Sequence, residues 1–137
     1  MSAFTSTIEI DRPPAEVFAV ATDPRRFGEW QRDVVGVRML EGGVFTTTRR
    51  LGGTLTQQVV RHEPPRTWAV RGIAGPVRAH ATIGIEPLDD GRRSKVTFTL
   101  EFEGHGVGVP LIPLIRRQSA KLAPNSYRAL KRLIEAD

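Results

Sequence analysis

The chain has 137 residues, of which 39% are hydrophobic and 26% are charged, a composition typical of a globular protein that excludes a disordered or fibrous chain. It contains no cysteine, so disulfide bonds, zinc–thiolate centres and thiol catalysis are excluded. The formal net charge is +5, but the arginines occur singly or in pairs and no recognition motif accompanies them, so we expect no specific nucleic-acid partner.

The N-terminal segment predicts a strand and no targeting signal. Residues 1–7 contain neither a basic segment nor an apolar run, so we expect no signal peptide, and the cytoplasm is the expected location. No apolar segment of the sequence is long enough to span a bilayer. Over residues 4–11, a side with Phe4, Ile8 and Ile10 alternates with a polar side, which predicts a half-buried strand.

Two short helices are predicted to follow this strand. Pro13 and Pro14 suit the first turn of a helix that residues 15–21 can complete. Asp23 is a favourable N-cap residue, and Pro24 is a favourable first residue for a second helix over residues 25–30.

An extended pattern then continues from residue 34 to residue 103. Turn signals divide it into six predicted strands, over residues 34–39, 44–51, 54–62, 67–73, 77–86 and 95–103. The pair Gly52-Gly53 indicates a tight hairpin between the second and third of these. Because every connection is short, the segments predict an antiparallel meander.

The last segment, residues 110–136, is predicted to form one long amphipathic helix over one face of the sheet, with a cavity between them. Its apolar residues recur mostly at intervals of three, four or seven positions, namely Leu111, Leu114, Ile115, Leu122, Leu130, Leu133 and Ile134. Pro124 lies inside this segment, where proline removes the hydrogen bond to the Ala120 carbonyl. We therefore expect a kink at Pro124 or a break into two helices.

Four segments carry a family resemblance. Residues 8–30 read IEIDRPPAEVFAVATDPRRFGEW and combine a strand with the motifs PPAEVF, TDP and EW. Further matches are HEPPRTW at residues 62–68, IEPLDDG at 85–91 and LKRLIE at 130–135. Over essentially its whole length, the chain resembles the polyketide cyclase/dehydrase branch of the START-like (SRPBCC) superfamily.

The resemblance implies an α+β, helix-grip (START-like) fold. In this fold a strongly bent seven-stranded antiparallel sheet wraps around a long C-terminal helix, and two short helices follow the first strand. It also implies a single ligand-binding domain over residues 1–137 with a deep, mostly apolar pocket. Members include polyketide aromatases and cyclases, lipid and quinone carriers and hormone receptors. The matched motifs build the fold and are not a catalytic set, so the resemblance assigns no reaction.

Strand alternation identifies the side chains that we expect to face the helix. The apolar ones are Leu55, Val59, Trp68, Val70, Ala79, Ala81, Ile83, Ile85, Val96, Phe98, Leu100 and Phe102. The polar residues Arg49 and Gln57 share this direction and would need partners or a ligand if buried. The alternative is that a bulge or a frayed edge turns both side chains to solvent.

The candidate ligand-binding residues are these two polar residues and four aromatic ones, Trp30, Trp68, Phe98 and Tyr127. For three of the aromatic residues we keep a structural alternative. Trp68 would then be a core aromatic residue, Trp30 would pack under the mouth of the sheet, and Tyr127 would lie at the edge of the helix with its hydroxyl in water.

No catalytic or metal-binding pattern accompanies this set. His62, His80 and His105 lack the short spacing of metal ligands. Neither a glycine-rich phosphate cradle nor a base beside Ser119 or Ser126 is evident. We expect no cofactor and no metal, and the catalytic residues remain unassigned.

The leading functional hypothesis is binding of a small hydrophobic or aromatic molecule between the sheet and the C-terminal helix. An alternative is a polyketide cyclase or dehydratase in which Arg49 polarises a carbonyl group. A second alternative is a module that interacts with a membrane surface or RNA through its basic surface and is released by salt. The oligomeric state stays open, and a homodimer is one alternative.

Overall fold

The structure, a computed structural model, describes residues 4–50 and 53–136. Seven strands form one antiparallel sheet: β1 (Phe4–Ile10), β2 (Val34–Met39), β3 (Val44–Arg49), β4 (Gly53–Glu63), β5 (Thr67–Ala74), β6 (Val77–Leu88) and β7 (Arg93–Gly104). Their order in the sheet is β1-β7-β6-β5-β4-β3-β2. The first strand therefore pairs with the last, and the remaining neighbours follow chain order, as expected for a meander.

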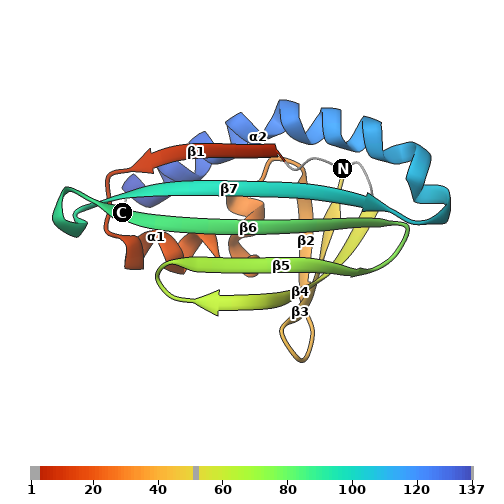
Figure 1. Ribbon diagram of the computed structural model, residues 1–137, viewed down its shortest axis with the longest axis horizontal. Helices are drawn as coiled ribbons and strands as arrows, with labels where there is room; N and C mark the ends of the chain where they lie inside the picture. The colour runs from red at the N-terminus through yellow and green to blue at the C-terminus, as the bar shows by residue number, and fades with distance from the viewer. Residues whose placement is uncertain (1–3, 51–52, 137) are drawn as a thin grey trace.

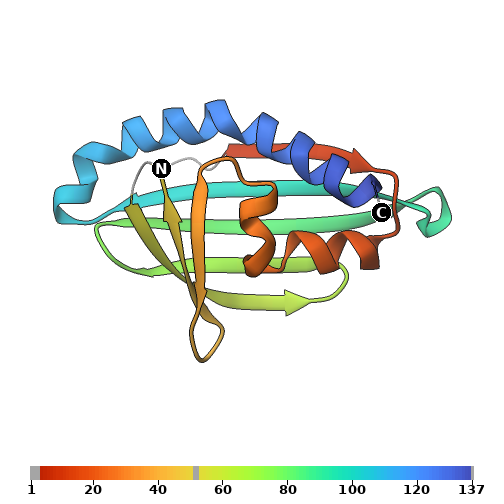
Figure 2. The same cartoon turned by 180° about the vertical axis from the view of Figure 1, so that it is seen from behind.

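Helices cover the concave side of this sheet (Figures 1 and 2). They are α1 (Pro14–Ala21), the short 3-10 helix η1 (Pro24–Glu29) and the long α2 (Ile112–Glu135). Two further 3-10 helices, η2 (Asp89–Gly91) and η3 (Gly106–Leu111), lie in the connections from β6 to β7 and from β7 to α2. The predicted cap of the second helix is present, because the Asp23 carboxylate accepts a hydrogen bond of 3.1 Å from the backbone N–H of Arg25. The predicted helix-grip fold is confirmed.

The C-terminal helix differs from the prediction at two points. It begins at Ile112, because the glycine-rich segment before it forms η3. It also continues through Pro124 without interruption, so the predicted break into two helices is wrong. Figures 1 and 2 show α2 following a curve over the sheet. Burial of Ile115 before the proline and of Leu130 after it offsets the loss of one backbone hydrogen bond.

Two features bend the sheet around α2. The pairing register shifts between β4 and β5 at Thr56/Gln57 and again at Val59/Arg61, and such bulges increase local twist and curvature. Gly72 on β5 approaches β6 so closely that a Cβ atom there would lie 2.9 Å from the backbone nitrogen of Ala79. Only glycine fits this close approach. The Gly52 half of the predicted hairpin, together with Leu51, lies outside the described residues.

The predicted alternation of the strands is confirmed. Along β7 the side chains of Val96, Phe98 and Phe102 are buried, and on β3 Phe45 and Thr47 are fully buried. The expected inward set as a whole is buried or half-buried. Most residues of this inward set line the cavity described next.

Candidate ligand-binding site

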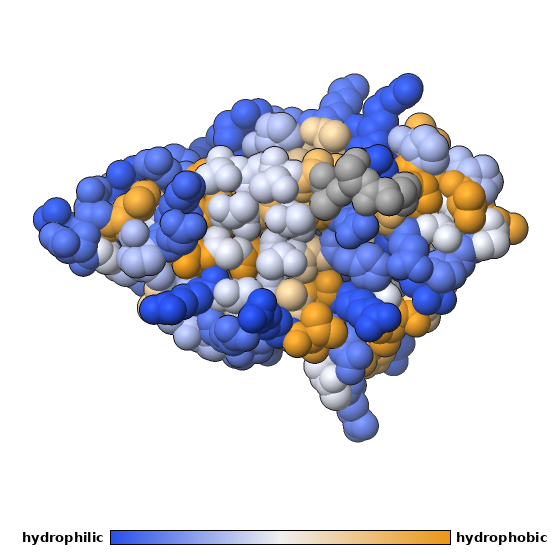
Figure 3. All heavy atoms as spheres, viewed as in Figure 1, coloured by the Kyte–Doolittle hydropathy of each residue, from blue (hydrophilic) through white to orange (hydrophobic). Residues whose placement is uncertain are grey.

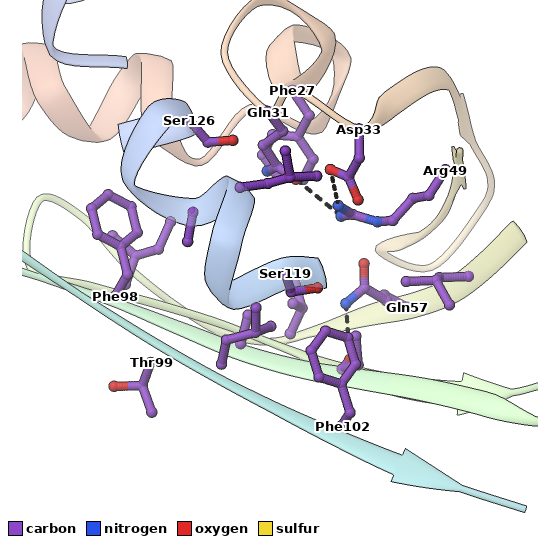
Figure 4. A pocket seen from close by; sticks show the side chains of 18 of the residues that line it. Phe27, Gln31, Asp33, Arg49, Gln57, Phe98, Thr99, Phe102, Ser119 and Ser126 are labelled. Carbon is purple, nitrogen blue, oxygen red and sulfur yellow. Dashed lines mark hydrogen bonds and ion pairs between the residues drawn. The ribbon is translucent and has the colours of Figure 1, made fainter. Parts of the chain in front are cut away.

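A cavity lies between the concave face of the sheet and α2. Its walls come from β3 to β7, the loop after η1, and the inner face of α2. The centre of a water-sized group can occupy about 110 Å³ of it. Most of its lining is apolar, including Leu55, Val70, Ile83 and Ile115, and Figure 4 shows these walls converging on the space beneath the helix.

Aromatic rings pack edge to face beside the cavity. Phe27 makes edge-to-face contacts with Trp30, Phe45 and Trp68 at centroid distances of 5.8, 5.9 and 5.9 Å, respectively. Trp30 and Trp68 are each only 3% exposed. Both line the cavity, so each serves at once as core residue and as wall. Packing in the core and a place in the cavity wall are therefore compatible for both tryptophans.

A stacked pair joins the sheet to the helix beside these rings. The rings of Phe98 on β7 and Tyr127 on α2 lie 4.0 Å apart at an interplanar angle of 11°. Tyr127 is 9% exposed and lines the cavity, so its ring lies between α2 and the sheet and not at an exposed edge of the helix. Its direction depends on how α2 is seated on the sheet, which the helical periodicity alone does not specify.

Gln57 supplies a polar group in the apolar wall. Its side chain is 4% exposed, and its amide nitrogen donates a hydrogen bond of 2.9 Å to the Ala79 carbonyl. Only the nitrogen can donate to a carbonyl, so the orientation of the amide is fixed. Figure 4 shows the amide oxygen on the opposite side, facing the Arg49 side chain. Gln57 therefore offers a hydrogen-bond acceptor to the cavity.

Arg49 belongs to a second polar cluster in the cavity wall. Its guanidinium donates hydrogen bonds of 3.0 Å to the Asp33 carboxylate and 2.9 Å to the Gln31 side-chain oxygen. The side chains of Arg49 and Asp33 are 18% and 17% exposed, so this ion pair is largely shielded from water. The alternative that Arg49 and Gln57 point to solvent is wrong. The Arg49 charge is balanced by a carboxylate rather than left free.

The six predicted residues, Trp30, Arg49, Gln57, Trp68, Phe98 and Tyr127, all line this cavity. Their role in binding a ligand stays a prediction. Sequence reasoning missed Gln31 and Asp33, which lie in a loop without periodicity. It also missed Ser126, whose hydroxyl accepts a hydrogen bond of 3.1 Å from the Arg32 backbone N–H and ties this loop to α2. The helical phase of Ser126 could have indicated its direction.

Few ionisable groups reach the cavity. Among the described lining residues they are Asp33, Arg49 and Tyr127, and the first two neutralise each other. Within residues 4–50 and 53–136, no group of three His, Asp or Glu side chains is arranged to hold a metal ion. The described wall therefore has hydrogen-bonding groups and one ion pair, and the Tyr127 phenol is its remaining ionisable group.

Tyr127 provides a test of this environment by pH titration. Burial raises the pKa of Tyr127 to about 12, above its ordinary value of about 10. The unfolded chain therefore releases this proton first, so the phenol's contribution to stability is complete below about pH 10 and is lost as the pH rises toward 12. Tyr127 is the only tyrosine, so phenolate absorbance reports this group alone. Equal midpoints for the native and the urea-unfolded protein would contradict its burial.

Comparisons with known proteins agree with this geometry. A family model described as "Polyketide cyclase / dehydrase and lipid transport" matches residues 1–135. A search of curated proteins finds no match. Within the described residues, no helix is long and apolar enough to cross a membrane.

Three solved structures illustrate the likeness of fold. A START superfamily protein from Mycobacterium smegmatis has a TM-score of 0.76 at 13% identity, covering 98% of this chain and 97% of that one. A conserved protein from Geobacillus kaustophilus has a TM-score of 0.75 at 17% identity, with coverages of 97% and 95%. The di-domain ARO/CYC BexL from the BE-7585A biosynthetic pathway has a TM-score of 0.75 at 19% identity, with coverages of 98% and 47%. At these identities the likeness concerns the fold alone.

Proposed function

The chain belongs to the polyketide cyclase/dehydrase and lipid transport family, and we propose that it binds a small, mainly apolar aromatic molecule in the cavity between the sheet and α2, in the cytoplasm. The observation that carries this proposal is an apolar, aromatic-walled cavity with one oriented acceptor, the Gln57 amide oxygen. Apolar walls with a few placed polar groups are the usual composition of a small-molecule site.

The size of the cavity supports a compact ligand. One water needs about 10–15 Å³ on the same measure, so 110 Å³ accommodates on the order of ten water-sized groups. This suits a molecule of one or two rings. A long, folded chain would need the helix or the mouth to move.

The polar groups favour binding over acid–base catalysis. The charge of Arg49 is balanced by Asp33, so it is poorly placed to stabilise a developing enolate. The phenol of Tyr127 is neutral at physiological pH, and burial raises its pKa further above its ordinary value of about 10. The alternative of a cyclase in which Arg49 polarises a carbonyl group is supported by the likeness of fold to the ARO/CYC protein. It would require a substrate that displaces Asp33 from Arg49.

Replacing Gln57 by leucine tests the oriented acceptor. We expect the affinity for para-cresol, whose hydroxyl can donate to Gln57, to fall roughly three- to tenfold, the usual worth of one neutral hydrogen bond. The affinity for toluene, which lacks the hydroxyl, should stay unchanged. Isothermal titration calorimetry with both compounds measures the difference.

The neighbouring Gln58 offers a matched control. It is the same residue type on the same strand, but it points to the other face of the sheet and does not line the cavity. Gln58→Leu should leave both affinities at the wild-type value. An equal loss for toluene and para-cresol in Gln57→Leu would show that the amide does not orient the ligand.

A further inference from the structure

Four large apolar side chains are exposed together where η3 leads into α2. Val107 is 78% exposed, Val109 57%, Leu111 44% and Leu114 52%. We refer to these four residues as the apolar tip. Figure 3 shows hydrophobic residues gathered at the right-hand end of the molecule, where Figure 1 shows η3 and the start of α2. Exposed apolar side chains grouped in this way usually mark an interaction surface.

Backbone contacts of η3 keep the apolar tip at the surface of the molecule. Gly108 packs so tightly that a Cβ atom there would lie 1.8 Å from the Pro76 carbonyl oxygen. The same oxygen accepts a hydrogen bond of 2.8 Å from the backbone N–H of His105. η3 is therefore fixed against the turn between β5 and β6. The outward direction of its apolar side chains therefore follows from this backbone packing.

A basic stripe continues from the apolar tip along the outer face of α2. We refer to Arg117, Lys121 and Arg128 as the basic stripe. They follow Leu114 at helical spacing, and all three are exposed. From Gly104 to Ile134 the sequence has no Asp or Glu, whereas it has six basic residues, Arg116, Arg117, Lys121, Arg128, Lys131 and Arg132. The nearest acidic residue before this segment, Glu103, accepts hydrogen bonds from His80 and His105. Lys131 pairs with Glu135, so the positive charge of this face is concentrated at Arg117, Lys121 and Arg128.

We propose that the apolar tip and the basic stripe of α2 dock the protein onto a bilayer surface that bears anionic headgroups. Apolar side chains at a protruding end can enter the interface between headgroups and acyl chains, while a lysine and arginine face attracts anionic lipid. RNA would use the positive charge but would leave the four aliphatic side chains in water. A second copy related by a twofold axis through this face would place two basic stripes against each other.

This inference goes beyond the proposed function, because docking does not require an occupied cavity. Docking would nevertheless bring the bilayer close to a ligand in the cavity. Ile115 and Ser119, on the inner face of the same turns of α2, line the cavity. A ligand that partitions into membranes would then reach the site where the protein touches the bilayer.

Vesicle co-sedimentation tests the docking surface. We expect the protein to bind vesicles of phosphatidylcholine with phosphatidylglycerol more tightly than vesicles of phosphatidylcholine alone, and less tightly as salt rises. The double variant Arg117→Gln/Lys121→Gln should bind the anionic vesicles roughly tenfold or more weakly, since each basic residue near such a surface contributes about fivefold. Val107→Ser/Leu114→Ser should weaken binding to a similar degree.

Two matched pairs control for general effects. Val35→Ser/Val60→Ser removes two valines that are 58% and 56% exposed elsewhere, and Arg25→Gln/Arg38→Gln lowers the net charge by the same amount at exposed positions outside α2. Both should bind the vesicles like the wild type, and para-cresol binding should be unchanged in all four variants. Equal losses in test and control pairs would overturn the proposal. So would RNA binding without vesicle binding, or a dimer that Val107→Ser/Leu114→Ser dissociates while vesicle binding persists.

Discussion

Replacing Ala123 by phenylalanine is expected to abolish binding of para-cresol while leaving the fold intact. Ala123 is half-buried on the inner face of α2, lines the cavity and packs against the main core cluster. A benzyl group at this position fills the space that the ligand would occupy. Inserting it into an existing void should change the free energy of unfolding by no more than the roughly 1–3 kcal/mol that overpacking costs. Calorimetry measures the binding, and urea denaturation measures the stability.

Ala120 provides the matched control for this substitution. It lies on the same helix one turn earlier but is exposed and does not line the cavity. Ala120→Phe should therefore bind para-cresol like the wild type. If Ala123→Phe also bound para-cresol with unchanged affinity, the ligand would lie elsewhere. Because Ala123 is not part of the apolar tip or the basic stripe, vesicle binding should survive in this variant.

Replacing Phe98 by alanine should have the largest effect on stability. Phe98 is 4% exposed, stacks on Tyr127 at 4.0 Å and lies 6.2 Å from the ring of Trp30. Truncation of a buried phenylalanine costs about 3–5 kcal/mol, from lost burial and the enlarged void. A domain of this size has a total stability of about 5–15 kcal/mol, so the variant should lie close to the limit of folding. Urea denaturation should show a much lower midpoint.

The variant Phe98→Leu distinguishes the stability contributed by the stacked ring from that contributed by side-chain volume alone. Leucine restores much of the volume, so its cost should be clearly smaller, close to the roughly 1.5 kcal/mol of a conservative core exchange. A cost of about 1 kcal/mol or less for Phe98→Ala, the range of an average substitution, would show that this pair does not hold α2 against the sheet.

The strands and the direction of their side chains could be predicted from the sequence because strand geometry has a period of two. Once the turns divide the chain, the parity of Gln57 or Phe98 follows from its neighbours. The register shifts did not disturb this. At the first shift the extra residue, Ile73, lies on β5, and the second shift comes after Gln57, so Leu55 and Gln57 on β4 keep the same inward direction. Local rules were therefore sufficient for the walls.

The mouth and the roof of the cavity could not be predicted in the same way. Asp33 lies in a loop, where no periodicity specifies the direction of a side chain, so its ion pair with Arg49 was not foreseen. The direction of Tyr127 depends on how α2 rotates against the sheet. The continuity of the helix at Pro124 depends on packing at both of its ends, which outweighs the local cost of the proline. In each case tertiary contacts, not local propensity, decide the outcome.

A nuclear magnetic resonance titration of the isotope-labelled protein with naphthol tests the central claim, ligand binding in this cavity, most directly. The chain has two tryptophans, and both line the cavity, so its two indole N–H signals report on the cavity wall. The indole nitrogen of Trp30 is buried without a hydrogen-bond partner in the described part of the chain, which makes it sensitive to a nearby hydroxyl. We predict that both indole signals shift and saturate together at one naphthol per chain, and that neither shifts in Ala123→Phe. Unchanged indole signals, with shifts confined to exposed residues such as those of the apolar tip, would contradict the account.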